Sequence, residues 1–249
     1  MASDTDTSAP LAFSRQTYAS YAKLLARARF NDADPGLGGR LLWAGELDAG
    51  GRALVVAGNI AGAASLTASP DAAAQRQAVR DGITDFLVTS LDEALRILKN
   101  QIRKRETVAV CVGLPVEAVE REMDERGVLP DLRRREVMDA PTPDTGSKAL
   151  VIWRVSAGPA RWLPKLDAVA LECLDPQDWI GQRWLRFAGR YLGRASLGAH
   201  MVWSTRHFGA RFVDRVREEA KRGEINAAVQ VEIEMDGRRE AHFVGSETT

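Results

Sequence analysis

The stretch WAGELDAGG has the residue types of a phosphate-binding loop. It follows a short apolar run and contains Gly45, Gly50 and Gly51. Glycines let backbone N–H groups approach a phosphate without interference from a Cβ atom. The stretch therefore predicts a dinucleotide cradle between a strand and the next helix. Two acidic residues inside it, Glu46 and Asp48, bring negative charge to the place where a pyrophosphate would bind.

The other groups with catalytic potential are few. The histidines are His200, His207 and His242, and neither they nor the cysteines have metal-site spacing, so we predict no metal site. His200 and His207 flank the stretch AHMVWST, where α/β enzymes place catalytic groups, but nothing in the sequence pairs either with a nucleophile. Cys173 follows an apolar run and is predicted to be a buried strand residue rather than a nucleophile.

Tryptophans and arginines are frequent in the second half of the chain. They are interpreted as a packed core with amphipathic edges in preference to a ligand platform. The basic stretch KNQIRKR is interpreted as the last turn of a surface helix rather than as a contact with a phosphate or an acidic partner. The run Arg133–Arg135 is likewise interpreted as surface charge.

The elements that position the glycine stretch follow a strand and helix alternation. Helices are predicted over 16–30, 69–82, 90–105 and 116–127, the third with a capping box of Ser90 and Glu93. Between them lie the short strands RLLWAG, TDFLVTS, TVAVCVGL and VLPDL. The segment ALVVAGNIAGAASLT is compatible with a buried helix followed by a buried strand, which periodicity does not separate. The predicted fold is α/β, a Rossmann-like parallel sheet flanked by helices.

The second half is predicted to be a smaller α/β or α+β region. KALVIWRVS, LDAVALECL and AHMVWST resemble strands, DWIGQRWLRFAGRYLG and HFGARFVDRVREEAKRG resemble helices, and Asp236-Gly237 is a type I′ hairpin signal. The expected organisation is a flexible leader, a Rossmann domain, a linker or loop, the second region and a tail, over residues 1–12, 13–135, 136–148, 149–244 and 245–249.

Composition narrows the class of partner. Lys plus Arg and Asp plus Glu both number 34, so the net charge is zero and argues against a general nucleic-acid binder. No apolar stretch reaches the ~20 residues that span a bilayer, so no membrane partner is expected. Two cysteines and no apolar signal segment favour a cytoplasmic protein.

Residues from about Tyr18 to Leu132 resemble the Rossmann-like, NAD-binding domain of the urocanase (urocanate hydratase) family. The segments GGRLLWAGELDAGG, RDGITDFLVTSLDEAL and TVAVCVGL with ERGVLPDL carry the resemblance, in this order and at similar spacing. The resemblance implies NAD as cofactor, a cytoplasmic enzyme of histidine catabolism, a hydro-lyase that converts urocanate to imidazolonepropionate, and a homodimer.

Four positions decide whether that chemistry is retained. Glu46 and Asp48 stand at glycine positions of the family, and Ser69 replaces an acidic residue that binds the ribose, while Asp71 matches the family's second acid. A charge repulsion at ~4 Å is worth about 4 kcal/mol at an effective dielectric near 20. A helix N-cap or first-turn acid is the preferred explanation of Asp71, ahead of a contact with the ribose. The candidate cofactor residues are thus Gly45, Gly50, Gly51 and Asp71, in a weakened cradle, with no catalytic residue assigned.

Two functions remain open from the sequence. One is a diverged urocanase-like protein that lacks full hydratase activity, because the polar segment and the cysteine strand of the family are missing. The other is a non-catalytic module on the same scaffold that binds a small molecule or takes part in assembly.

Overall fold

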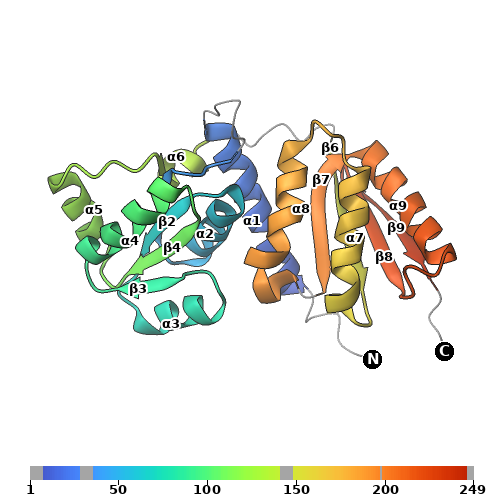
Figure 1. The fold of residues 1–249 in the computed structure, drawn as a ribbon, viewed down its shortest axis with the longest axis horizontal. Coiled ribbons are helices and arrows are strands. Elements are labelled where there is room, and N and C mark those ends of the chain that lie inside the picture. The colour runs from blue at the N-terminus through green and yellow to red at the C-terminus, as the bar shows by residue number, and fades with distance from the viewer. Residues whose placement is uncertain (1–7, 29–35, 141–147, 197, 246–249) are drawn as a thin grey trace. The chain divides into compact units, whose positions relative to one another are not determined.

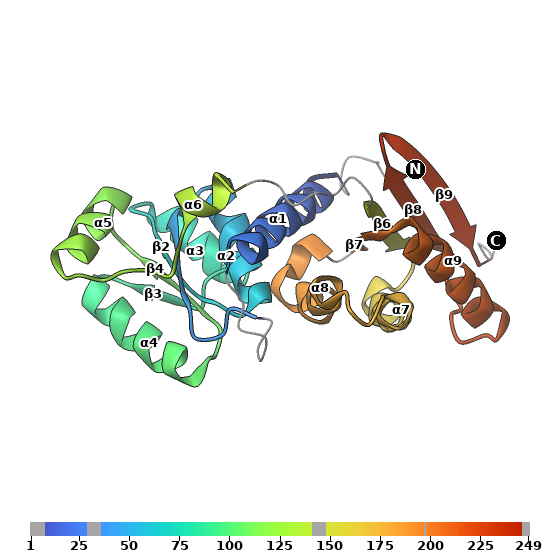
Figure 2. The same cartoon turned by 90° about the horizontal axis from the view of Figure 1, so that it is seen from above.

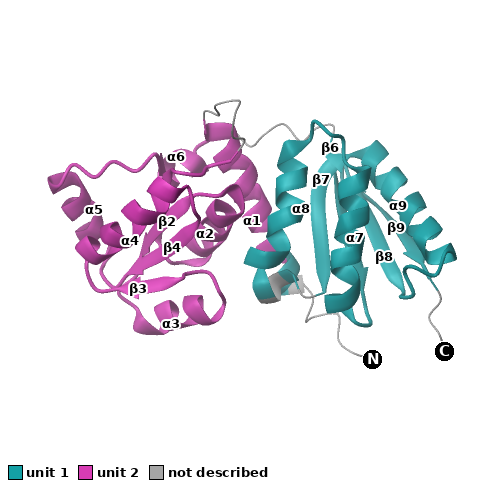
Figure 3. Ribbon diagram, in the orientation of Figure 1, with its two compact units in different colours: residues 1–11, 144–249 teal, residues 12–143 magenta. Residues whose placement is uncertain are grey.

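The computed structural model describes residues 8–28, 36–140, 148–196 and 198–245. It divides into two compact units, shown in separate colours in Figure 3. Residues 12–143 form one, the Rossmann-like unit, and residues 1–11 with 144–249 form the other, the antiparallel unit. Among the described helices, none is long and apolar enough to cross a membrane.

The Rossmann-like unit contains a parallel five-stranded sheet in the order β3-β4-β2-β1-β5. Strands β2, β3 and β4 are labelled in Figure 1. Its elements are α1 (Ser8–Arg27), β1 (Leu41–Glu46), α2 (Ala49–Ala61), β2 (Ala64–Ala68), α3 (Ala72–Arg80), β3 (Phe86–Val88), α4 (Leu91–Lys104), β4 (Val108–Val112), α5 (Val116–Glu125), β5 (Leu132–Arg133) and α6 (Arg134–Met138). The chain leaves β1 toward β2, yet β5 pairs with the other side of β1. The carboxyl ends of β1 and β5 therefore form the topological switch point, where open α/β sheets bind ligands.

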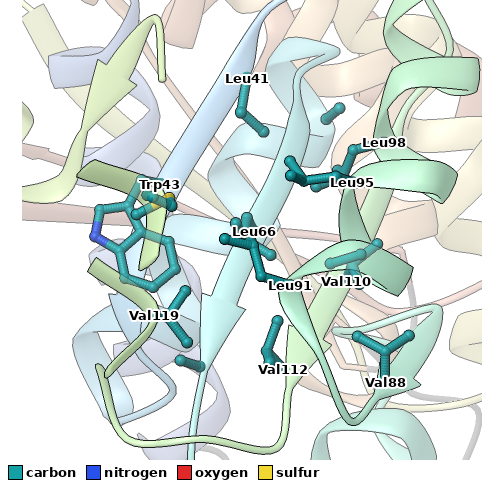
Figure 4. Packing of buried hydrophobic residues seen from close by; sticks show 14 of the residues in the cluster. Leu41, Trp43, Leu66, Val88, Leu91, Leu95, Leu98, Val110, Val112 and Val119 are labelled. Atoms are coloured by element: carbon teal, nitrogen blue, oxygen red, sulfur yellow. The ribbon is translucent and has the colours of Figure 1, made fainter. Parts of the chain in front are cut away.

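Helices cover both faces of this sheet. On one face α4 and α5 pack over β1, β2 and β4 through an apolar cluster that includes Trp43, Leu66, Leu95 and Val110 (Figure 4). On the other face α2 packs so closely that a Cβ atom on Gly58 would lie 2.7 Å from Leu42 Cδ2 and 2.8 Å from Ser65 Oγ. Burial on both faces explains why the strands are continuous apolar runs.

The antiparallel unit contains a four-stranded sheet in the order β7-β6-β8-β9. Its elements are β6 (Lys148–Val155), α7 (Pro159–Cys173), α8 (Trp179–Tyr191), η1 (Gly193–Ser196), β7 (Ala199–Thr205), α9 (Arg206–Lys221), β8 (Val229–Met235) and β9 (Arg238–Val244). Helices α7, α8 and α9 cover one face of the sheet (Figure 2). On that face the ring of Trp153 lies 5.0 Å from the ring of Phe212.

The opposite face of this sheet follows from the strand register. Trp153 pairs with Val231 and faces the helices, so the neighbouring pairs Arg154 with Gln230 and Ile152 with Glu232 face the other way. Polar and charged side chains of β8 and β9 therefore gather on the face without helices.

Several predicted elements are confirmed. The undecided segment after the glycine stretch is a helix, α2, and then a strand, β2, with Gly62 as a left-handed cap at φ 95°. The Ser90 hydroxyl oxygen caps α4 by accepting from the Glu93 N–H, and the Glu93 carboxylate accepts a hydrogen bond from the Thr89 N–H. Asp236 and Gly237 both have positive φ, as a type I′ turn requires.

Three expectations need correction. LDAVALECL is not a strand but the second half of α7, whose buried residues, including Trp162, Leu166, Ala170 and Cys173, recur at helical spacing. The first helix begins at Ser8 rather than near Phe13, because SAPLAFSR contains good helix formers and its proline stands in the first turn.

The third correction concerns the linker. The predicted linker over 136–148 overlaps α6, which ends at Met138, and Lys148 already belongs to β6. Val137 is fully buried, which gives this short helix a packing reason. Residues 141–147 and the tail beyond 245 lie outside the described residues.

Candidate functional site

The glycine stretch forms the end of β1 and the first turn of α2, not an extended loop. Asp48 is the N-cap of α2, and its Oδ1 accepts a hydrogen bond of 2.7 Å from the Gly51 N–H. The first-turn N–H groups of a helix have no partner within the helix and attract anions. In this protein the carboxylate of Asp48 is the anion at the start of α2.

Arg134 covers the N-terminus of α2 from the other side of the switch point. It is the first residue of α6, directly after β5. Its Nη2 donates to Asp48 Oδ2 at 3.0 Å and its Nη1 donates to the Glu46 carbonyl oxygen at 3.2 Å. The guanidinium group therefore ties the carboxyl end of β1 to the N-terminus of α2.

The ion pair with Arg134 affects the pKa of Asp48. Partial burial opposes the charge of Asp48, but the hydrogen bond and charge of Arg134, with the Gly51 N–H, outweigh it and hold the pKa of Asp48 below its ordinary value. Asp48 is therefore a stable carboxylate at neutral pH. The charges of Glu46, Asp48 and Arg134 sum to −1, so the site as a whole repels a phosphate.

The three predicted glycines have local structural reasons. A Cβ atom on Gly51 would lie 1.8 Å from the Glu46 carbonyl oxygen, and one on Gly50 would lie 2.7 Å from Arg134 Nη2. Gly45 has φ +68°, next to an irregularity in the β1–β2 register. The space above Gly50, which a pyrophosphate would need, is filled by the arginine side chain.

The end of β2 offers little for a ribose. Ser69 is buried, its Oγ lies 3.3 Å from the Asp71 N–H and its carbonyl oxygen accepts from Gln75 Nε2 at 2.7 Å. Asp71 is exposed and caps α3 through the Ala73 N–H at 2.8 Å. Asp71 thus has the N-cap contact that the sequence offered as its alternative explanation.

These contacts decide whether the site suits a dinucleotide. A tightly bound NAD would need free N–H groups at the start of α2 and an acidic residue beside the ribose. At the start of α2 the Gly51 N–H is engaged by Asp48 and the space above Gly50 is taken by Arg134, and the position of the acidic residue is a buried serine. The residues present therefore do not fit NAD in the Rossmann manner.

The remaining candidates lie on other elements of the two units. Cys111 is buried in β4, and burial together with the charge of Glu46 raises the pKa of its thiol to about 11. Cys173 is buried in α7, where desolvation raises its pKa. Neither has the thiolate character of a nucleophile. Within the described residues, no group of three potential metal ligands comes together.

A histidine–aspartate pair ties β7 to α7. His200 Nδ1 lies 2.8 and 2.7 Å from the two carboxylate oxygens of Asp167, and Trp153 Nε1 donates to the same carboxylate at 3.0 Å. Among the described residues, no serine or cysteine hydrogen bonds to this imidazole. His207 is exposed on α9 and is not brought near the pair.

The tryptophans support the core interpretation, because Trp153, Trp162 and Trp184 are buried. Sequence reasoning missed Arg134 as the residue that closes the switch point. The only available signal was the arginine run at the last strand of the Rossmann-like unit, and such a run is equally typical of a charged surface.

The fold and this site define a protein with a Rossmann-like α/β domain joined to an antiparallel α+β unit. Residues 16–136 match the family model of the urocanase Rossmann-like domain. The resemblance expected from the sequence is confirmed over this segment, which is a little under half of the chain. No curated protein shows significant similarity to the chain.

Proposed function

We propose that this protein keeps the urocanase Rossmann-like scaffold without its chemistry, and that it neither holds NAD nor hydrates urocanate. The observation that carries the proposal is the Asp48–Arg134 ion pair at the start of α2. A dinucleotide would have to break this pair and would meet the negative charge of Glu46. The Rossmann-like unit then acts as a non-catalytic module for binding or assembly, in a cytoplasmic protein.

The direct test is the cofactor content of the purified full chain. Denaturation followed by mass spectrometry is expected to release no stoichiometric NAD. Absorbance of urocanate is expected to stay constant when the protein is added with and without NAD. Recovery of one NAD per chain, or steady loss of urocanate, would overturn the proposal and favour a diverged NAD-dependent hydratase.

A thermal shift separates weak from absent binding. A ligand at 100 times its Kd adds about 2.7 kcal/mol of stability, which corresponds to several degrees in a chain of this size. We expect no shift with NAD at millimolar concentration. A shift that disappears in Arg134→Ala would show instead that the arginine binds the cofactor rather than excluding it.

The homodimer implied by the family is a further part of the proposal. Light scattering of the full chain at micromolar concentration is expected to give twice the monomer mass. A monomer at all concentrations would remove assembly through self-association from the functions of the module.

A further inference from the structure

A cavity of about 1170 Å³ lies on the antiparallel unit. Arg154, Gln230, Glu232, Arg239 and Phe243 are among the residues that line it. The register places these side chains together, because Arg154 pairs with Gln230 and Gln230 pairs with Phe243 across neighbouring strands. The cavity therefore lies over the sheet face opposite the helices and extends to the end of the sheet where β6 ends and α7 begins, far in sequence from the glycine stretch.

A buried carboxylate organises this cavity. The side chain of Glu232 is only 4 % exposed, and its Oε1 accepts hydrogen bonds from Arg154 Nη1 and from Gln230 Nε2, the latter at 2.8 Å. The side chain of Arg154 is 22 % exposed. A charged pair held in a mostly buried place has one preferred geometry, so the guanidinium group of Arg154 is presented rigidly.

The arginines have donors to spare. A guanidinium group carries five N–H donors, and among the described residues Glu232 is the partner that the structure gives Arg154. Arg239 binds Glu234, and its side chain is 57 % exposed. Glu234 thus neutralises Arg239, and the feature that favours an anion is the set of Arg154 donors that Glu232 does not use.

One atom of the cluster lacks a donor. Glu232 Oε2 is buried without a hydrogen-bond partner among the described residues, and the nearest cation is Arg239 Nη1 at 3.5 Å. A buried carboxylate oxygen without a donor is costly, and such atoms mark places where a ligand or water completes the network. Since Arg239 is mostly exposed, it can turn toward a bound anion and open Oε2 to a donor on the same molecule.

Apolar groups complete the wall. Phe243, whose side chain is 73 % exposed on the edge strand β9, lies on the same face as Arg154, and Pro159 at the start of α7 lines the end of the cavity. A large apolar side chain beside a fixed arginine is typical of sites for small organic anions, in which the charge sets the orientation and the carbon skeleton packs.

We infer that this cavity binds a small hydroxycarboxylic acid. Its carboxylate accepts hydrogen bonds from Arg154 and Arg239, its hydroxyl donates to Glu232 Oε2, and its carbon skeleton packs against Phe243. The carboxylate takes up the unused donors of Arg154, and the hydroxyl supplies the donor that the buried carboxylate lacks. The inference is independent of the proposed loss of NAD binding.

The test compares two acids that differ by one hydroxyl group. Lactate and propionate are titrated into the full chain by calorimetry and by NMR. Lactate is expected to bind and propionate to bind at least ~10-fold more weakly, because it leaves Glu232 Oε2 without a donor. Equal affinities, or no binding of lactate at tens of millimolar, would overturn the inference.

Three variants locate the binding. Arg239→Gln and Glu232→Gln are each expected to weaken lactate at least ~10-fold. Arg238→Gln is the matched control, since this exposed neighbour on β9 points to the other face of the sheet and does not line the cavity. A loss of affinity in Arg238→Gln equal to that in Arg239→Gln would contradict the site, and melting curves show that each variant is folded.

Discussion

The two units differ in how completely they satisfy a carboxylate that belongs to a candidate site. In the Rossmann-like unit Asp48 is about half exposed, and both of its oxygens are engaged, by the Gly51 N–H and by Arg134. In the antiparallel unit Glu232 is almost fully buried and one of its oxygens has no donor among the described residues. The place where the family suggests a ligand is thus completed by the protein itself, whereas an unsuspected place is left incomplete.

The difference between Asp48 and Glu232 shows how the burial of a charged group can indicate a binding site. A half-exposed ion pair contributes little to stability, about 0–1 kcal/mol, and closes a crevice at small cost. A buried carboxylate destabilises the fold unless its oxygens have hydrogen-bond donors. Its presence therefore indicates a function more strongly than a half-exposed ion pair does. Four predictions test this contrast.

The largest effect is expected for Arg154→Met. The substitution leaves the carboxylate of Glu232 buried without its main partner, which should lower the free energy of unfolding by about 3–5 kcal/mol. Urea unfolding followed by tryptophan fluorescence measures it, because Trp153 and Trp184 lie in the same unit. Arg239→Gln, at the exposed partner, is the control and should cost less than about 1 kcal/mol. A loss below about 1 kcal/mol for Arg154→Met would remove the contrast between the units.

Gly51→Ala comes next. Its Cβ atom would meet the Glu46 carbonyl oxygen, a backbone atom that cannot move alone, and we expect a loss of about 3 kcal/mol. Gly50→Ala is the matched comparison, because its Cβ atom would meet only the end of the Arg134 side chain and should cost about 1 kcal/mol or less. Equal losses would show that the start of α2 is not packed as described.

Asp48→Ala should cost about 1–2 kcal/mol at neutral pH through loss of the N-cap. The pKa of Asp48 in the folded state lies below its ordinary value of 3.8. The charged carboxylate therefore stabilises the fold above that value, and its contribution falls as the pH drops through the folded-state pKa. The difference in unfolding free energy between the wild-type chain and the variant should shrink below about pH 4. A difference that grows in acid would contradict the ion pair.

The smallest effect concerns the cysteines, and it is kinetic. Burial raises the pKa of both thiols, that of Cys111 to about 11, so a disulfide reagent at pH 8 should modify neither in the folded protein within minutes. Both should react at once in denaturant. Rapid labelling of Cys111 in the native chain would show that the Rossmann-like sheet opens.

Much of the fold was accessible from the sequence because local signals carried it. Caps such as Ser90, the hairpin dipeptide at Asp236 and the apolar strands of the parallel sheet act over a few residues, and each predicts its element. The failure at α7 has the same cause, since a short apolar run such as LDAVALECL satisfies both periods until its upstream residues Trp162 and Leu163 are added.

At the candidate sites, too, local features could be predicted from the sequence and tertiary contacts could not. By itself the sequence determined that the glycine stretch carries two acids and that the segment resembles the urocanase Rossmann-like domain. Only the tertiary structure decided that Arg134, 86 positions beyond Asp48, satisfies one of those acids, and that Arg154 and Glu232, 78 positions apart, meet across two strands. Contacts of this kind depend on strand order and register, which no local pattern encodes. The sequence also does not show whether a charged side chain has its hydrogen-bond partners within the protein.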